Sequence, residues 1–185
     1  KAPQSSIRVI TNAVLYSRAL LEAIQWPRVT ATTSIDAGNP GTFQVVRGLD
    51  AFDKVFGNVR AYAAKSPRAV TLKYIMTEEN NDIENIEGFA DQIVDYALSA
   101  CNFQLSVDFN QPSVSTDILV ALAVLYHRLK RAGCAVVYLD DLVRERLAPE
   151  TVPRLEDLRA MAAVFGAGEA LADPAAYDAV AGGGA

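Results

Sequence analysis

The chain has 185 residues, which is enough for one ordinary domain with a substantial core. Hydrophobic residues make up 51% and charged residues 21%, a globular composition that excludes a disordered chain. The net charge is -5 and the basic residues are scattered, so no basic face is predicted. Because phosphate contacts need such a face, nucleic acid is not expected as a partner.

The sequence also argues against a membrane protein. No apolar run approaches the ~20 residues of a membrane span, and the start, KAPQSSIRVI, lacks the apolar core of a signal peptide. That start has no initiator Met and enters a strand almost at once, so we interpret it as a cut end. Cys101 and Cys134 match no metal-ligand spacing and are expected to be buried thiols in a reducing compartment. We therefore expect a cytoplasmic protein without a membrane partner.

Five apolar, β-branched runs predict β-strands. They are Ile7–Thr11, Val29–Ile35, Ala69–Thr77, Phe103–Phe109 and Cys134–Leu139. Each run is nearly continuous in its hydrophobicity, which is typical of strands buried on both faces.

Helical patterns separate the strands. Apolar residues recur at helical spacing in Leu15–Ile24, Asp50–Lys65, Ile83–Ala100 and Ser115–Ala132. Ser115 is a candidate N-cap of the longest helix, and Gly133 is a candidate end for it. A single helical turn is expected at Thr42–Val46.

Alternating strands and helices predict an α/β fold with right-handed crossovers and a parallel sheet. A closed eight-stranded barrel needs ~250 residues. Five strands therefore predict part of a TIM-like barrel, with an open doubly wound sheet as the alternative. We assign residues 1–141 to this βα domain and residues 142–185 to an Ala-rich helical tail with a frayed end.

The stretch TSIDAGNPGTFQVVRG carries the best candidate for a ligand site. In parallel α/β folds, ligands bind at the carboxyl ends of the strands. Here Ser34 and Asp36 follow the second strand, and a short helix would return Arg47 over the strand end. An arginine can hold a carboxylate with two hydrogen bonds, while Asp36 can accept from an amine or hydroxyl. This pattern favours an amino-acid-like ligand.

The wider sequence resembles a known family. The segments ITNA, VTATTSIDAGNPGTFQVVRGLDAFDKVFGNVRAY and AVTLKYIMTEENNDIENIEGFADQIVDYA occur in that order. The ordered set is similar to the C-terminal half of the radical S-adenosylmethionine (SAM) domain and covers roughly residues 7 to 110.

The resemblance implies roles for individual residues. Ser34 and Arg47 would hold the carboxylate of SAM, and Asp36 would lie on the substrate or ribose side. Asn12 would lie near the rim, and Lys73 would line the cavity. Near the adenine it places the segment from Val107 through Asp108 to Phe109. Ala13 departs from the family, which usually has Gly after Thr-Asn.

Two further departures concern the cofactor. The family holds a [4Fe–4S] cluster with three cysteines spaced C-x-x-x-C-x-x-C and uses a Gly-Gly-Glu-like segment, and this sequence contains neither. We therefore expect part of a radical SAM enzyme that lacks the cluster-binding half, with no metal site or catalytic residue of its own. Such a chain would be inactive alone, and its substrate, a small molecule or a peptide, is not identified.

Two alternatives remain. One is a non-catalytic half-barrel that forms homo-oligomers through an open sheet edge. The other is an α/β enzyme with unrelated chemistry, for which no nucleophile–base pair is evident.

Overall fold

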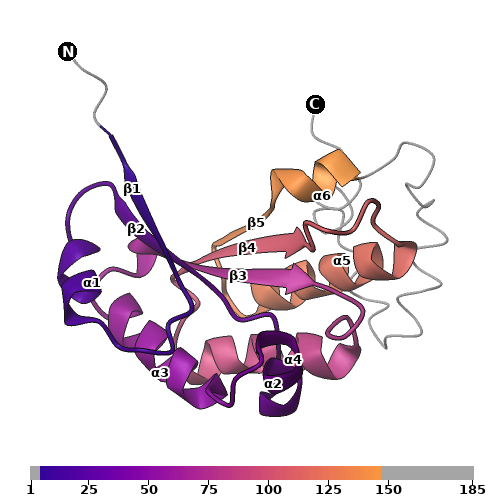
Figure 1. The fold of residues 1–185 in the computed structure, drawn as a ribbon, viewed down its shortest axis with the longest axis horizontal. Coiled ribbons are helices and arrows are strands. Elements are labelled where there is room, and N and C mark those ends of the chain that lie inside the picture. Colours follow the sequence, from indigo (N-terminus) through magenta and orange to yellow (C-terminus); the bar gives the residue numbers. More distant parts are fainter. Residues whose placement is uncertain (1–4, 147–185) are drawn as a thin grey trace.

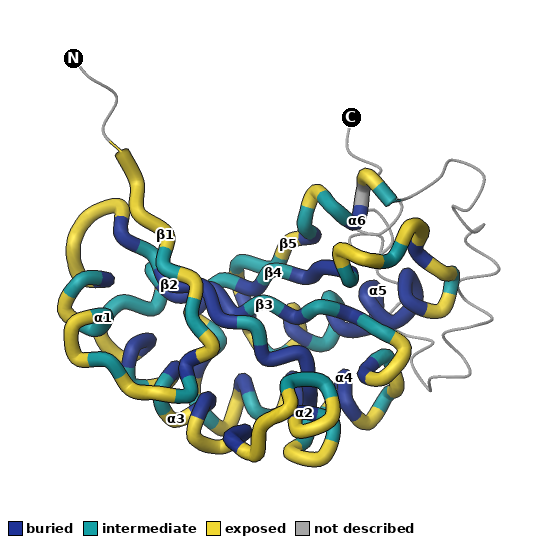
Figure 2. The backbone as a smooth tube through the Cα atoms, in the orientation of Figure 1, coloured by how far each residue is buried: buried dark blue, intermediate teal, exposed yellow. Residues whose placement is uncertain are grey.

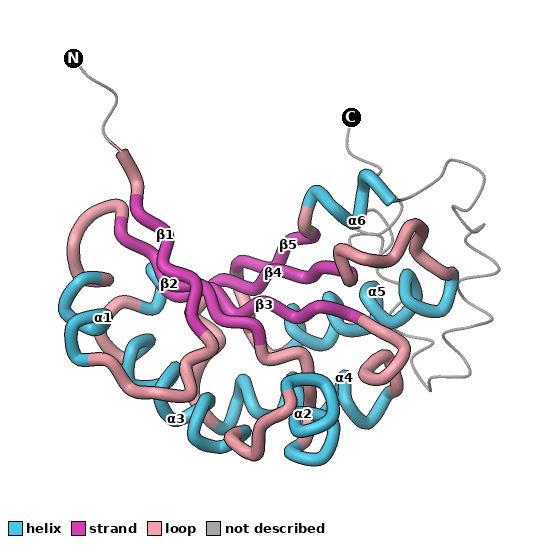
Figure 3. The backbone as a smooth tube through the Cα atoms, viewed as in Figure 1, coloured by secondary structure: helices cyan, strands magenta, loops and turns pink. Residues whose placement is uncertain are grey.

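The computed structural model describes residues 5–146, in which strands and helices alternate (Figures 1 and 3). The strands are β1 (Ile7–Thr11), β2 (Val29–Ser34), β3 (Val70–Met76), β4 (Asn102–Val107) and β5 (Val136–Leu139). The helices are α1 (Arg18–Ala23), α2 (Pro40–Arg47), α3 (Phe52–Ala63), η1 (Pro67–Ala69), α4 (Ile83–Asp95), α5 (Thr116–Arg131) and α6 (Asp141–Arg146). Of the predicted Ala-rich tail, residues 142–146 belong to α6, and residues 147–185 lie outside the described part of the chain.

All five strands are parallel, and their order in the sheet is β1-β2-β3-β4-β5. Each strand therefore pairs with its neighbour in the sequence, and right-handed crossovers place the connecting helices on the same face. Figure 1 shows α1, α3, α4 and α5 along that face. The predicted α/β fold and partial TIM-like βα arrangement are confirmed. The doubly wound alternative is wrong, because its strand order would reverse at a switch point.

The two faces of the sheet differ in burial. In β3, Leu72 and Tyr74 are buried against the helices, whereas Lys73 and Ile75 between them are only half-buried (Figure 2). The prediction of strands buried on both faces is therefore wrong. We call the face without these helices the open face.

Aromatic side chains fill the layer between the sheet and the helices. Phe56 of α3 contacts Phe52, Phe89 and Tyr96, and Tyr74 of β3 meets Phe89 edge-on with ring centroids 5.0 Å apart. These rings join α3, α4 and β3 in one apolar core, which fixes the strand ends relative to one another.

Helix ends agree with the sequence where the capping residue is typical. Ser115 caps α5 by accepting a hydrogen bond from the Ile118 amide, and the chain leaves α5 through Gly133 at φ +83°. In contrast, α4 ends at Asp95, five residues before the predicted Ala100. The backbone turns there at Ala97, which takes the left-handed conformation at φ +55°.

Candidate functional site

The carboxyl ends of β2, β3 and β4 meet around a small pocket, as parallel strands require. Its volume is about 400 Å³. We call it the rim pocket; it is lined by Asp36, Val45, Val46, Arg47, Ile75, Thr77, Glu79 and Asp108. Three of the predicted site residues, Asp36, Arg47 and Asp108, therefore come together here.

Asp36 is the most constrained residue of the rim pocket. It is 2% exposed and has a left-handed backbone at φ +59°, a conformation that Asp tolerates better than most residues. Its Oδ1 atom accepts a hydrogen bond from the Ile75 amide at 2.6 Å. Burial raises the pKa of Asp36 to about 6, although that hydrogen bond and the charge of Arg47 both favour the ionised form.

Arg47 reaches Asp36 because α2 turns the chain back over the end of β2. Asn39 caps α2 by accepting from the Thr42 amide, Pro40 starts the helix, and Gly48 ends it at φ +70°. This helix is longer than the predicted single turn and includes Arg47 in its last turn. Arg47 Nη1 donates to Asp36 Oδ2 at 3.0 Å, so the arginine predicted to bind a ligand carboxylate already holds an internal one.

Asn80 ties the exits of β2 and β3 together. It is fully buried, and its amide nitrogen lies 2.9 Å from both the Asp36 and the Ile75 carbonyl oxygens. Its side-chain oxygen accepts from the Thr77 amide at 2.7 Å. One asparagine thus satisfies three backbone groups of the rim, which fixes the two loops to each other.

A close backbone contact fixes the loop that precedes α2. The Gly38 amide donates to Asn85 Oδ1 at 3.1 Å. A Cβ atom on Gly38 would collide with the backbone of Asn85 and Phe89, and one on Gly88 would lie 2.5 Å from the Gly38 carbonyl oxygen. The loop and α4 can approach this closely because both positions are glycine.

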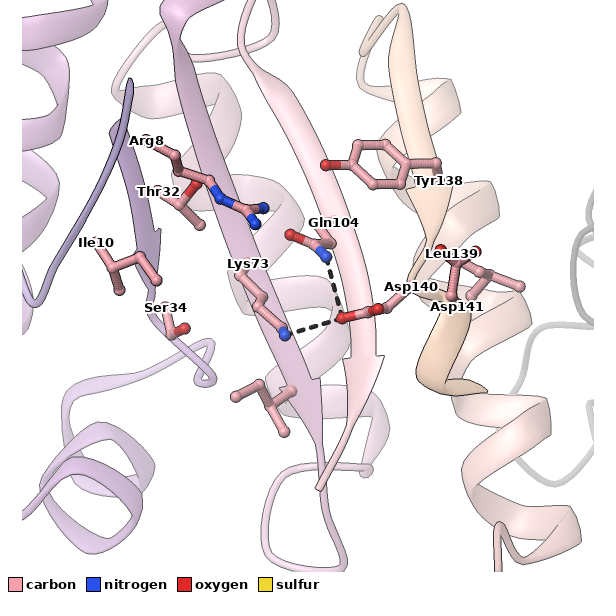
Figure 4. Close-up of a pocket in the computed structure, with 11 residues that line it drawn as sticks. Arg8, Ile10, Thr32, Ser34, Lys73, Gln104, Tyr138, Leu139, Asp140 and Asp141 are labelled. Atoms are coloured by element: carbon pink, nitrogen blue, oxygen red, sulfur yellow. Dashed lines mark hydrogen bonds and ion pairs between the residues drawn. The ribbon is translucent and has the colours of Figure 1, made fainter. Parts of the chain in front are cut away.

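The open face carries a second, larger pocket of about 580 Å³ (Figure 4). We call it the face pocket; it is lined by Arg8, Ile10, Thr32, Ser34, Lys73, Ile75, Gln104, Tyr138, Leu139, Asp140 and Asp141. Ser34 and Lys73, both predicted site residues, therefore lie here and not in the rim pocket. The two pockets meet at Ile75, which lines both.

One carboxylate oxygen organises the face pocket. Asp140 Oδ2 accepts from Lys73 Nζ at 2.9 Å, from Gln104 Nε2 at 3.0 Å and from Ser106 Oγ at 3.0 Å. Burial disfavours the charged form of Asp140, but the hydrogen bond from Lys73 and the other donors outweigh it and hold the pKa below its usual value. Asp140 is thus an ionised anchor that orients three side chains.

The other predicted site residues lie apart from these pockets. Asn12 is exposed, and its side chain accepts from the Val14 amide within its own turn. Val107 is buried on the helix-covered side of β4, so only its backbone is near the rim. Sequence analysis missed Arg8, Gln104, Ser106 and Tyr138, although polar residues alternate with apolar ones in FQLSV and would have placed Gln104 and Ser106 on one face.

No family model, curated protein or solved structure matches this chain. Its site must be interpreted from its own geometry.

Residues 5–146 contain no group of three His, Cys, Asp or Glu side chains placed to hold a metal ion. Cys101 and Cys134 are free and buried, and burial raises their pKa values to about 12 and about 11. They precede β4 and β5, at the opposite ends of these strands from the rim pocket. Neither thiol suits a cluster, which binds thiolates. Among the same residues, no helix has the length and apolar character needed to cross a lipid bilayer.

Proposed function

We propose that this chain is the C-terminal half of a radical SAM barrel and contributes the strand ends that hold SAM. The observation that carries the proposal is the return of Arg47 over the end of β2, beside Asp36. This placement lets Asp36 and Arg47 act on one ligand at the carboxyl edge of a parallel sheet, as the resemblance implies.

The chemistry of the rim pocket fits SAM. The cofactor carries a carboxylate, an ammonium group and two ribose hydroxyls. Arg47 supplies a charged donor for the carboxylate, and Asp36, Glu79 and Asp108 supply acceptors for the ammonium and hydroxyl groups. The rim pocket's volume of about 400 Å³ lies within the usual range of small-molecule sites.

The turn after β1 gives independent support. Ala13 is buried and takes the left-handed conformation at φ +53°. Glycine adopts this conformation without strain, which explains why a Gly would be usual at this position of the motif. Ala13 therefore departs from the motif in residue type, whereas its backbone has the conformation that a glycine would adopt there.

A [4Fe–4S] cluster, when bound, would supply the electron for reductive cleavage of SAM into methionine and a 5′-deoxyadenosyl radical. Cys101 and Cys134 do not fit such a cluster, so the proposal requires a second polypeptide segment that provides its ligands. This chain binds and orients the cofactor, and alone it is catalytically inactive.

The internal ion pair sets the expected affinity. A ligand carboxylate has to displace Asp36 from Arg47 or share the guanidinium with it. This chain would supply only part of the SAM site, and Arg47 is already paired with Asp36. We therefore expect weak binding of SAM, with a Kd in the millimolar range.

Calorimetric titration of the full chain with SAM tests the proposal. Weak, saturable binding that is lost in Arg47→Ala but kept in Arg60→Ala is expected, since Arg60 is an exposed residue of α3 with the same charge. The proposal is wrong if Arg47→Ala binds SAM as well as the unmodified chain does.

A second candidate function is a half-barrel that assembles through its edge. Ile7 and Ile10 on the edge strand β1 are 58% and 78% exposed, and Trp26, in the connection between α1 and β2, is 66% exposed. Sedimentation analysis should then show a dimer that Ile10→Lys dissociates. A chain that is monomeric at high concentration would exclude this assembly.

A further inference from the structure

The open face presents a row of polar side chains across four strands. Strand register places Ser34 opposite Lys73, Lys73 opposite Gln104, and Gln104 opposite Tyr138. All four line the face pocket. In a filled TIM barrel the corresponding inward layers are bulky branched apolar residues. A polar row at this place indicates a surface for water or a polar ligand and not one built for apolar packing.

The positive charges of the face pocket differ in their partners. Lys73 is paired with Asp140, which leaves two of its three N–H groups for other contacts. Arg8, from the edge strand β1, forms no ion pair with another residue of the part of the chain described here. Figure 4 shows its side chain extending across the sheet toward Gln104.

Tyr138 reaches over the same area from the other edge. Its ring extends from β5 toward Gln104 in Figure 4, and its hydroxyl group lies on the side of Arg8. Burial and the carboxylate of Asp140 raise the pKa of Tyr138, and the positive charge of Arg8 opposes this rise. The Tyr138 hydroxyl is therefore a neutral donor at ordinary pH, within electrostatic reach of the guanidinium.

We infer that the face pocket binds the anionic group of a small polar ligand between Arg8, Lys73 and the Tyr138 hydroxyl. The group is a carboxylate or a phosphate, since a guanidinium fork suits the oxygens of both. In the context of the proposed function, on which this assignment rests, the ligand is the substrate and lies beside the SAM site across Ile75. Binding itself depends only on the open face.

The acidic residues of the pocket restrict where the anion lies. The charge of Asp140 is balanced by Lys73, and Gln104 and Ser106 also donate to the carboxylate, whereas Asp141 is exposed at the start of α6. The anion should therefore bind toward β1, away from Asp141. Removing that charge in Asp141→Asn should strengthen binding slightly, by about twofold.

Nuclear magnetic resonance titration of the ¹⁵N-labelled full chain tests the inference. Succinate and inorganic phosphate serve as probes at constant low ionic strength. The probe that binds more tightly identifies the anionic group as a carboxylate or a phosphate. We expect saturable shifts of the amide signals of Arg8, Lys73, Gln104 and Tyr138. Arg8→Ala should weaken binding roughly tenfold or more, because one charge-assisted hydrogen bond accounts for about that factor. Arg8→Lys should have a smaller effect.

Arg60→Ala removes the same charge from α3 on the covered side and should leave anion affinity unchanged. Equal losses in Arg8→Ala and Arg60→Ala would show non-specific charge attraction and overturn the inference. The inference would also be overturned if neither succinate nor phosphate gave saturable shifts of the amide signals. Anion binding without SAM binding would support this site and reject the proposed function, so the two failures are distinguishable.

Discussion

Asp36 holds Arg47 through a 3.0 Å ion pair in which the carboxylate is buried and the guanidinium is partly exposed. In the proposed function, a ligand carboxylate would compete with Asp36 for Arg47. A protonated Asp36 would release Arg47, so ligand affinity and protein stability should both depend on the charge of one buried carboxyl group.

Asp36 should make the protein less stable as the pH rises. Its pKa is about 6 in the folded chain, above the ordinary value of 3.8, so its contribution is fully present below about pH 4 and is lost as the pH rises through about 6. Asp36→Asn removes this titration and keeps an acceptor for the Ile75 amide. The free energy of unfolding of the unmodified chain, minus that of Asp36→Asn, should fall by about 2–3 kcal/mol between about pH 4 and 8. Urea unfolding across this range measures it, and a constant difference would contradict the assignment.

Asp140 should have the opposite pH dependence. Its pKa is lowered in the folded chain, so its contribution is present above the unfolded pKa and is lost as the pH falls through the folded one. Asp140→Asn leaves Lys73 without its partner and should cost about 2 kcal/mol at neutral pH. Thermal unfolding should show this cost shrinking below about pH 4. A cost that stays the same in acid would mean that the carboxylate charge does not matter.

The contact between Gly38 and α4 predicts a large effect of one methyl group. Gly38→Ala should destabilise the chain by about 2 kcal/mol or more, because its Cβ would collide with the Asn85 backbone. Gly57→Ala is the matched control, since Gly57 lies within α3 with nothing near its Cβ position, and it should stabilise the chain by about 0.5–1 kcal/mol. Chemical denaturation measures both. Equal effects would show that the loop and α4 do not approach as closely as described.

The end of α4 predicts a stabilising substitution. Ala97→Gly should raise the free energy of unfolding by about 1 kcal/mol, because Ala97 has a left-handed backbone and an exposed side chain. The matched control is Ala64→Gly, since Ala64 is also exposed but ends α3 in the right-handed conformation at φ -58°. It should cost about 0.5–1 kcal/mol. Thermal unfolding of the two variants should move the midpoint in opposite directions.

The two helices α4 and α5 show why one end was predictable and the other was not. Both end with the same hydrogen bonds: the Ala97 and Leu98 amides donate to Val94 and Ile93, and the Gly133 and Cys134 amides donate to Lys130 and Leu129. The left-handed residue is Gly133 in α5, which the sequence reveals. It is Ala97 in α4, which the sequence does not reveal because alanine usually continues a helix.

The carboxyl edge of the sheet could be predicted from the sequence as the place of the site, but the contacts between the site residues could not. The rule that ligands bind at strand ends pointed to Asp36 and Asp108, and an expected helical turn pointed to Arg47; the structure brings these three residues around one pocket. The pairing of Arg47 with Asp36 is a tertiary contact between a strand exit and a helix end, which spacing alone does not determine. The network around Asp140 joins three strands, so it became visible only once their register was known.

The most direct test of the central claim maps where SAM binds. The ¹⁵N-labelled full chain is titrated with SAM, and the shifted amide signals are assigned. We predict shifts confined to the carboxyl ends of β2, β3 and β4, including Asp36, Arg47 and Thr77, and their loss in Arg47→Ala. Shifts that fall elsewhere, or that persist in Arg47→Ala, would contradict the assignment of this edge to SAM.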